Sequence, residues 1–322
     1  MKKRLLIAAL AVALVIALGL AAAGSYLVDF AIVRKDTPPD VAPDPIISSE
    51  DASVIANNRQ KIRDQKEAWL SSVEAEKKTI VSDDGLTLMG EIYWNESDSH
   101  KWLLGIHGYT SKKEDYRSLA SFFAEQGYHV LLPDMRSHGE SEGTYIGMGW
   151  LDRLDVLKWI DLIIEMDPDA EIILHGTSMG GATVMMVSGE TLPANVKGIV
   201  EDCGYTSVWD IFEDELAYLF NLPSFPILNA ASIIADIRAG YNFTEASAVS
   251  QIEKASVPVL FIHGAEDNFV HTDMVYEVYD ACPTAKDILV IEGAGHGEAY
   301  AMDPELYFDT VFGFISANCI PE

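Results

Sequence analysis

Cysteine is scarce in this sequence: Cys203, Cys282 and Cys319 are the only three, and no two of them form a C-x-x-C pair. Three widely spaced cysteines do not make a disulfide framework or a thiolate metal site. The chain also lacks a dinucleotide-binding G-x-G-x-x-G, a phosphate-binding loop and a metalloprotease H-E-x-x-H motif. The sequence therefore predicts neither a cofactor nor a metal ion.

Positive charge is the second scarcity. The chain has 22 Lys and Arg residues against 50 Asp and Glu, which gives a formal net charge of −28 at pH 7. A protein with this excess of negative charge repels phosphate backbones, so we predict no nucleic-acid partner. Hydrophobic residues make up 49 % of the 322 residues, which is enough for a large core and excludes a wholly disordered chain.

The N-terminus carries a long hydrophobic run. Lys2, Lys3 and Arg4 precede an uncharged segment from Leu5 to Val28. A segment of this length can span a bilayer, and it exceeds the roughly 7–15 apolar residues of a cleavable signal peptide. We therefore predict that residues 1–35 are a signal anchor of a single-pass protein of the cell membrane. Because the basic cluster comes first, the N-terminus is expected in the cytoplasm and the catalytic domain outside it.

The end of the hydrophobic run leaves an alternative open. Ala21, Ala22 and Ala23 are small enough to suit a signal peptidase, so the protein could instead be secreted after cleavage. Residues 36–78 are predicted to form a proline-containing spacer followed by one or two helical turns that lead into the domain.

Residues 79–322 alternate between short strand patterns and helical patterns. Asp83-Asp84-Gly85 lies between two β-prone runs and predicts a hairpin. Short apolar runs follow, most of them before a helical pattern, at 102–106, 130–132, 172–174, 199–200, 257–262 and 288–291. Strands of this kind predict an α/β fold whose mostly parallel sheet has helices on both faces and an antiparallel edge at the hairpin.

The segment from about 205 to 250 breaks this alternation. It is rich in apolar and aromatic residues and contains Pro223 and Pro226, but it has no convincing strand pattern. We predict a helical insertion that caps one end of the sheet. The alternative is a pair of ordinary helices packed on the sheet.

The strongest chemical signal is Gly176-Thr177-Ser178-Met179-Gly180, which fits G-x-S-x-G. It follows the predicted strand 172–174 and opens a helical segment, which is the setting of a nucleophile elbow. The glycines let the chain fold tightly and leave room for a substrate beside the serine hydroxyl. Ser178 is therefore the predicted nucleophile.

A serine hydroxyl needs a base that takes its proton and an acid that orients the base. His296 lies in a glycine-rich loop just after the last predicted strand, and Asp267 follows the strand 257–262. Both residues thus follow strands on the same rim of the sheet as Ser178. We predict His296 as the base and Asp267 as the acid.

Other acids and bases nearby stay open as alternatives. Glu266 adjoins Asp267, and His263 and His271 lie in the same part of the chain. We rank them second because His263 is expected to end the strand and His271 to enter the following helix.

The tetrahedral intermediate of acyl transfer also needs hydrogen-bond donors for its oxyanion. Met179 follows the nucleophile at the start of a helix, and Tyr109 lies in the loop after the predicted strand 102–106. Their backbone N–H groups are the predicted oxyanion hole. His107, in the same loop, is assigned a structural role.

These motifs resemble the serine α/β-hydrolase superfamily, in which serine, acid and histidine follow one another in this order. The resemblance runs from about Thr79 to the C-terminus and is carried by His107-Gly108-Tyr109, residues 133–141, Gly176–Gly180, Gly264-x-x-Asp267 and Gly295-His296-Gly297. With its N-terminal anchor, the chain is similar to membrane-anchored or exported bacterial esterases, lipases and serine aminopeptidase-like proteins. The resemblance implies an α/β-hydrolase fold and the roles already assigned to Ser178, Asp267 and His296.

We therefore predict a serine hydrolase, similar to a carboxylesterase, that cleaves small-molecule esters of short or medium acyl chain through an acyl-enzyme intermediate. The aromatic insertion favours an apolar acyl or alcohol group. Three alternatives stay open. They are a serine aminopeptidase-like peptidase, an acyltransferase, and a surface module that binds a ligand without turnover. The acidic surface suits the free amine of a peptidase substrate.

Overall fold

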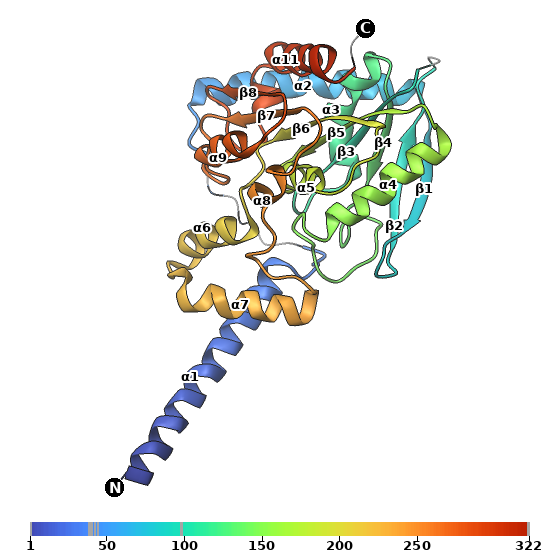
Figure 1. The fold of residues 1–322 in the computed structure, drawn as a ribbon. Coiled ribbons are helices and arrows are strands. Elements are labelled where there is room, and N and C mark those ends of the chain that lie inside the picture. The colour runs from blue at the N-terminus through green and yellow to red at the C-terminus, as the bar shows by residue number, and fades with distance from the viewer. Residues whose placement is uncertain (1, 38–40, 42, 44, 97–98, 321–322) are drawn as a thin grey trace.

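Eight strands form one sheet at the centre of the structure (Figure 1). The computed structural model describes residues 2–37, 41, 43, 45–96 and 99–320. The strands are β1 (Ala75–Val81), β2 (Thr87–Tyr93), β3 (Lys101–Ile106), β4 (His129–Pro133), β5 (Glu171–Thr177), β6 (Val196–Asp202), β7 (Val259–Gly264) and β8 (Lys286–Ile291). Their order across the sheet is β1-β2-β4-β3-β5-β6-β7-β8.

The sheet is parallel except at one edge. β1 pairs antiparallel with β2, and β2 pairs antiparallel with β4, whereas the pairings from β3–β4 to β7–β8 are parallel. The central strands are apolar runs with both faces buried, as expected for strands that helices cover on both sides. The predicted mostly parallel sheet and its antiparallel edge are confirmed.

Helices cover both faces of the sheet. They are α2 (Ser49–Ser72), α3 (Lys113–Glu125), α4 (Asp152–Met166), α5 (Met179–Ser188), α8 (Ala248–Ile252), α9 (Asp273–Ala281), α10 (Ala299–Met302) and α11 (Pro304–Asn318). On one face α4, α5, α8 and α9 share a core with Leu104 and Ile172. On the other face α3 and α11 share a core with Leu103 and Ile173. Successive residues of a strand thus supply the two cores in turn.

α2 is longer than the predicted one or two turns. It has 24 residues, and the Ser48 hydroxyl caps its start by accepting the N–H of Asp51. Its buried residue Ile55 packs in a small cluster with Ala301 of α10. The prediction was wrong in extent because tertiary contact, rather than strong periodicity along the chain, completes this helix. Residues 38–40, 42 and 44 of the predicted spacer lie outside the described residues.

Most of α1 (Lys2–Ala31) projects away from the domain, and only its last turns join it (Figure 1). Residues 2–19 are exposed, whereas Gly24 and Val28 are buried. A Cβ at Gly24 would lie 2.8 Å from backbone atoms of α7 (Ser224–Ala239), so glycine allows the two helices to touch. Arg238 of α7 also donates a 2.6 Å hydrogen bond to Asp29 of α1. The end of α1 is therefore part of the domain.

The chain that follows α1 is bound to the loop before α4. The N–H of Ile146 donates to the carbonyl of Ile32 at 2.7 Å, and the N–H of Arg34 donates to the carbonyl of Thr144 at 2.8 Å. These backbone bonds fix the direction in which α1 leaves the domain.

α6 (Val208–Phe220) and α7 follow β6 and form a layer beside the sheet rather than over either of its faces (Figure 1). α7 packs against α1 and α6. Within the layer, Phe212 of α6 meets Phe243 edge to face, with ring centroids 4.8 Å apart. The predicted helical cap insertion is confirmed, and its contact with α1 is an addition that the sequence did not indicate.

Candidate active site

Ser178 lies in a tight turn between β5 and α5. Its backbone has φ 60° and ψ −121°, a conformation that residues with a side chain rarely adopt. Glycine is needed on both sides of it. A Cβ at Gly176 would collide with Gly180, and a Cβ at Gly180 would collide with the carbonyl of Ile106. This is the strand–turn–helix geometry expected of G-x-S-x-G, and it presents the hydroxyl at the carboxyl edge of the sheet.

Three side chains from separate loops form a hydrogen-bonded chain at this edge. His296, in the loop after β8, has its Nε2 2.8 Å from Ser178 Oγ. Its Nδ1 lies 2.7 Å from Oδ2 of Asp267, in the loop after β7. If Nδ1–H donates to the carboxylate, Nε2 is left to accept the serine proton. The structure thus brings together the three residues that the sequence placed on one rim.

The Asp267 carboxylate is buried but ionised. Burial alone raises its pKa, yet the neighbouring His296 and His263 together hold the pKa well below its usual range. Its Oδ1 accepts the backbone N–H groups of Phe269 and Val270, both at 3.0 Å. A carboxylate with these partners stays charged at neutral pH and fixes the orientation of the His296 ring.

The three alternative residues lie in different surroundings. His263 is fully buried, and its Nε2 lies 2.9 Å from a backbone carbonyl and 3.3 Å from Oδ2 of Asp267. It therefore contacts the acid, whereas the ring that contacts Ser178 is that of His296. His271 is exposed just before α9, and the carboxylate that meets His296 is that of Asp267, not that of Glu266. The sequence did not indicate the contact of His263 with Asp267, because His263 was expected only to end the strand.

Two buried histidines hold the loop after β3, which carries Tyr109. His107 Nε2 accepts the N–H of Met135 at 3.0 Å, and His138 Nε2 accepts the N–H of Thr110 at 3.1 Å. Burial lowers the pKa of His107 to about 4 and that of His138 to about 3. Both rings are therefore neutral at pH 7 and keep the nitrogen lone pair that these bonds require.

This loop approaches the nucleophile closely. A Cβ at Gly108 would lie 3.2 Å from Ser178 Cβ, so the residue next to Tyr109 is in contact with the serine. Met179 is the first residue of α5, and the N–H groups of a first helical turn have no partner within the helix. The backbone N–H groups of Tyr109 and Met179 stay the predicted oxyanion donors.

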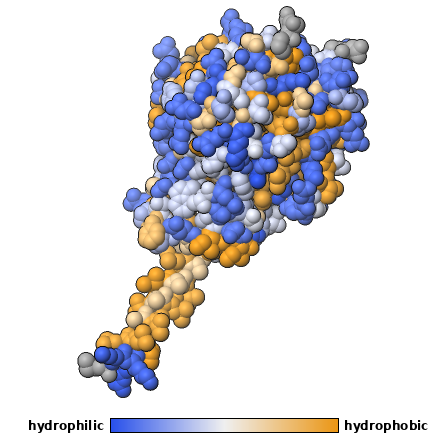
Figure 2. All heavy atoms as spheres, viewed as in Figure 1, coloured by the Kyte–Doolittle hydropathy of each residue, from blue (hydrophilic) through white to orange (hydrophobic). Residues whose placement is uncertain are grey.

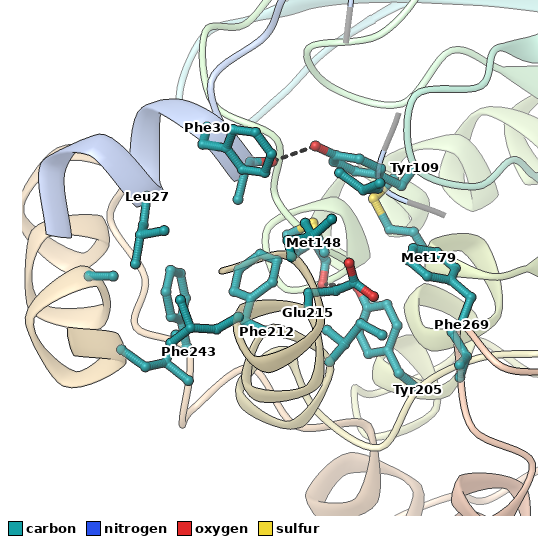
Figure 3. Close-up of a pocket in the computed structure, with 18 of the residues that line it drawn as sticks. Leu27, Phe30, Tyr109, Met148, Met179, Tyr205, Phe212, Glu215, Phe243 and Phe269 are labelled. Carbon is teal, nitrogen blue, oxygen red and sulfur yellow. Dashed lines mark hydrogen bonds between the residues drawn. The ribbon is translucent and has the colours of Figure 1, made fainter. Parts of the chain in front are cut away.

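An apolar pocket opens on one side of Ser178 (Figure 3). Its empty volume, with the open mouth included, is about 780 Å³. The cap and the end of α1 supply most of the wall, which includes Leu27, Phe30, Phe212, Phe220, Leu228 and Phe269. The Tyr109 hydroxyl donates to the carbonyl of Ala31 at 2.7 Å and so ties α1 to the loop beside the nucleophile. A pocket of this composition suits an apolar group.

A second pocket adjoins the first at Ser178 and is more polar. Thr110, Ser111 and Asp115 line it, together with His296. Ser178 and Tyr109 line both pockets. The nucleophile therefore lies where an apolar and a polar compartment meet.

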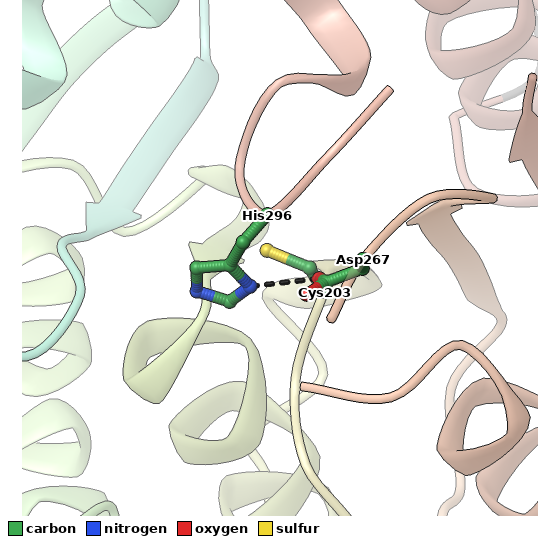
Figure 4. Close-up of side chains that lie close together, drawn as sticks. All are labelled: Cys203, Asp267 and His296. Atoms are coloured by element: carbon green, nitrogen blue, oxygen red, sulfur yellow. Dashed lines mark hydrogen bonds and ion pairs between the residues drawn. The ribbon is translucent and has the colours of Figure 1, made fainter. Parts of the chain in front are cut away.

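Cys203, just after β6, lies beside Asp267 and His296 (Figure 4). One ligand atom from each of the three lies within 4.8 Å of the others, which is close enough for a metal ion. Both ring nitrogens of His296 are, however, engaged with Asp267 and Ser178. Burial raises the pKa of the Cys203 thiol well above its usual range, so the sulfur stays protonated. The donor set therefore favours a proton-transfer chain over a metal site.

Two features of the site were not anticipated from the sequence. α1 was predicted as a membrane segment only, yet Leu27 and Phe30 line the apolar pocket. Glu215 of α6 lines it too, and its Oε2 is buried without a hydrogen-bond partner in the described part of the chain. Burial and the neighbouring Asp214 raise the pKa of Glu215 to about 7. The available signal was the spacing of Glu215 four residues after the apolar Ile211.

Known proteins share parts of this sequence. The family model described as serine aminopeptidase, S33 matches residues 97–210. The uncharacterized protein YqkD of Bacillus subtilis is 27 % identical over 223 residues, which cover 68 % of this chain and 72 % of YqkD. Alpha/beta hydrolase domain-containing protein 17C of Xenopus tropicalis is 37 % identical over 83 residues, which cover 25 % of this chain and 26 % of that protein.

Solved structures share the fold. The esterase Pf2001 of Pyrococcus furiosus is similar with a TM-score of 0.62 and 23 % identity, over 77 % of this chain and 94 % of that chain. The acylaminoacyl peptidase of Pyrococcus horikoshii is similar with a TM-score of 0.60 and 16 % identity, over 78 % of this chain and 42 % of that chain. With its mostly parallel sheet, its covering helices and its nucleophile turn, the chain has the α/β-hydrolase fold.

Proposed function

We propose that this protein is a serine hydrolase that cleaves carboxylic esters of short or medium acyl chain. The observation that carries the proposal is the hydrogen-bonded chain of Ser178, His296 and Asp267 at the junction of two unlike pockets. An ester places its acyl chain and its alcohol on opposite sides of the reacting carbonyl. The apolar pocket suits the acyl chain, and the polar pocket suits the alcohol.

In the proposed reaction, His296 Nε2 takes the proton of Ser178 as Oγ attacks the ester carbonyl carbon. The backbone N–H groups of Tyr109 and Met179 stabilise the oxyanion. The bond to the alcohol oxygen then breaks, and the alcohol leaves with the proton from His296. Water attacks the resulting acyl-enzyme and gives a proton to His296, which returns it to Ser178 as the carboxylic acid departs. Asp267 stays ionised and stabilises the protonated His296 in both steps.

A chain-length series tests this proposal. The full-length protein, purified in detergent, is assayed with p-nitrophenyl esters from acetate to palmitate. We expect turnover to peak at a short or medium chain, because the apolar pocket is bounded by α1 and the cap. Faster cleavage of aminoacyl p-nitroanilides would favour a peptidase. A folded protein that is inert to all of these substrates and to a fluorophosphonate probe would favour a ligand-binding module.

We also propose that α1 anchors the protein in the cell membrane and that the domain lies outside the cytoplasm. Within the described residues, α1 is the helix long and apolar enough to cross a membrane, and Lys2, Lys3 and Arg4 stand at its free end. The alternative is secretion after cleavage near Ala23. Cleavage there would leave the packed part of α1, from Gly24 onward, in the domain.

A second candidate function, release of an N-terminal amino acid, is favoured by Glu215. Its carboxylate lines the apolar pocket, and one of its oxygens has no hydrogen-bond partner among the described residues. When ionised, it is suited to bind the ammonium group of a substrate whose apolar side chain fills the pocket. When protonated, it leaves the pocket neutral and suited to an acyl chain.

The ionisation of Glu215 separates the two candidates. With its pKa near 7, the side chain gains charge between pH 6 and pH 8, whereas Glu215→Gln stays neutral. For a medium-chain ester we expect the ratio of kcat/KM in Glu215→Gln to that in the wild type to rise about tenfold across this range, because the protonated fraction of Glu215 in the wild type falls by about that factor. For an aminoacyl p-nitroanilide we expect the ratio to fall instead. A ratio that is flat with pH for both substrates would show that Glu215 does not face the bound substrate.

A further inference from the structure

The outer surface of the cap is apolar where it faces away from the domain. On α7, Phe225, Ile233 and Ile237 are 76 %, 62 % and 77 % exposed, and Tyr218 and Leu222 are exposed at the end of α6. We call these five residues the cap apolar face. Figure 2 shows apolar side chains gathered over α7 beside the point where α1 enters the domain. A soluble protein rarely exposes so many large apolar side chains together.

The length of the exposed part of α1 puts this face at the membrane surface. At about 1.5 Å per residue, residues 5–23 extend about 29 Å, close to the thickness of the hydrocarbon core of a bilayer. α7 touches α1 from Gly24 onward. The cap apolar face therefore lies directly where the hydrocarbon core ends on the outer side. Exposed Phe, Ile and Tyr side chains at that level are suited to the interface.

The same helix also forms a wall of the apolar pocket. Leu27 and Phe30 lie one and two turns beyond Gly24 and line the pocket (Figure 3). Phe30 packs edge to face on Phe220 of α6, with ring centroids 5.4 Å apart, and Tyr26 packs edge to face on the same ring at 6.3 Å. These aromatic side chains thus join the end of α1 to the cap at the wall of the pocket.

We propose that the substrate is an acyl ester dissolved in the outer leaflet, whose chain enters the apolar pocket between α1 and the cap while the cap apolar face is seated in the membrane. This inference rests on the proposed ester hydrolysis at Ser178 and names its substrate class. A membrane lipid is the favoured ligand of the apolar pocket, because the exposed bilayer segment of α1 continues directly into the helix turns that form the pocket wall beside the cap apolar face. The ester group then lies at Ser178, where the apolar pocket meets the polar pocket.

The test compares one ester in water with one in a bilayer. Full-length protein in phosphatidylcholine vesicles is assayed with p-nitrophenyl butyrate, which dissolves in water, and with p-nitrophenyl laurate, which partitions into the vesicles. The variant is Ile233→Ser with Ile237→Ser, since neither side chain lines the pocket. The control is Leu306→Ser, which removes a 45 % exposed leucine from α11, away from α1. We expect the double variant to lose about tenfold of laurate turnover with butyrate turnover kept, and the control to lose neither.

The outcomes distinguish this inference from the function on which it rests. If the wild type cleaves neither ester, the proposed hydrolysis fails. If the wild type cleaves both esters and the double variant has the same ratio of laurate to butyrate turnover, the proposed hydrolysis stands, and the proposed contact of the cap apolar face with the membrane is overturned. If the double variant converts a dimer into a monomer at an unchanged ratio, the face is an interface between copies of the chain, which also overturns the proposal.

Discussion

Replacing Ser178 by alanine should lower kcat/KM for p-nitrophenyl esters by roughly 10⁴-fold or more, because the proposed nucleophile is lost. The substitution removes one oxygen atom and leaves Gly176, Gly180 and the turn in place. The oxyanion donors and both pockets also persist, so weak residual hydrolysis is expected. The thermal stability should not change, because Ser178 Oγ makes its hydrogen bond to a partly exposed His296 and not to a core group.

Three companion variants sharpen this result. Ser250→Ala changes an exposed serine of α8 that lines neither pocket, and it should keep full activity. A fluorophosphonate probe should label the wild type and Ser250→Ala but not Ser178→Ala. In His296→Ala and in Asp267→Asn, kcat/KM should fall by roughly 10⁴-fold. The first variant loses the base, and the second loses the charge that orients the base. Full ester turnover in purified Ser178→Ala would overturn the assignment of the nucleophile.

The nucleophile turn could be predicted because its constraints are local. A positive φ at a non-glycine residue, with no room for a Cβ two positions before or after it, leaves a five-residue pattern that is visible in the sequence. Asp267 and His296 are 29 residues apart, and His296 is 118 residues from Ser178. They could still be located, because parallel strands bring their carboxyl ends to one edge of the sheet.

The walls of the pocket could not be predicted in this way. The sequence shows Leu27 and Phe30 only as members of a hydrophobic run. No local sequence pattern indicates that this run contacts α7, which lies about 200 residues later in the chain. The hydrophobic pattern of a bilayer segment is uniform, so it does not mark which side of the helix packs on protein. Glu215 likewise reads as one acid in the acidic stretch of α6 until the fold places it in the apolar pocket.

Replacing Gly24 by leucine should strongly reduce the turnover of medium-chain esters. A Cβ at this position lies 2.8 Å from backbone atoms of Ala230 and Ala231, well inside van der Waals contact, so α1 and α7 must move apart. Leu27 and Phe30 then move away from the pocket. We expect kcat/KM for p-nitrophenyl decanoate to fall about tenfold or more, and kcat/KM for the acetate, whose acyl chain is too short to need that wall, to change much less.

Gly19→Leu is the matched control for this prediction. It lies five residues earlier in the same helix, and a Cβ there meets nothing within 4 Å. Both variants add the same side chain to α1, so a loss caused by altered membrane insertion would appear in both. A loss caused by a displaced pocket wall appears in Gly24→Leu alone. Identical chain-length profiles for Gly24→Leu and Gly19→Leu, at equal amounts of vesicle-bound protein, would mean that α1 only holds the domain at the membrane and shapes no part of the pocket.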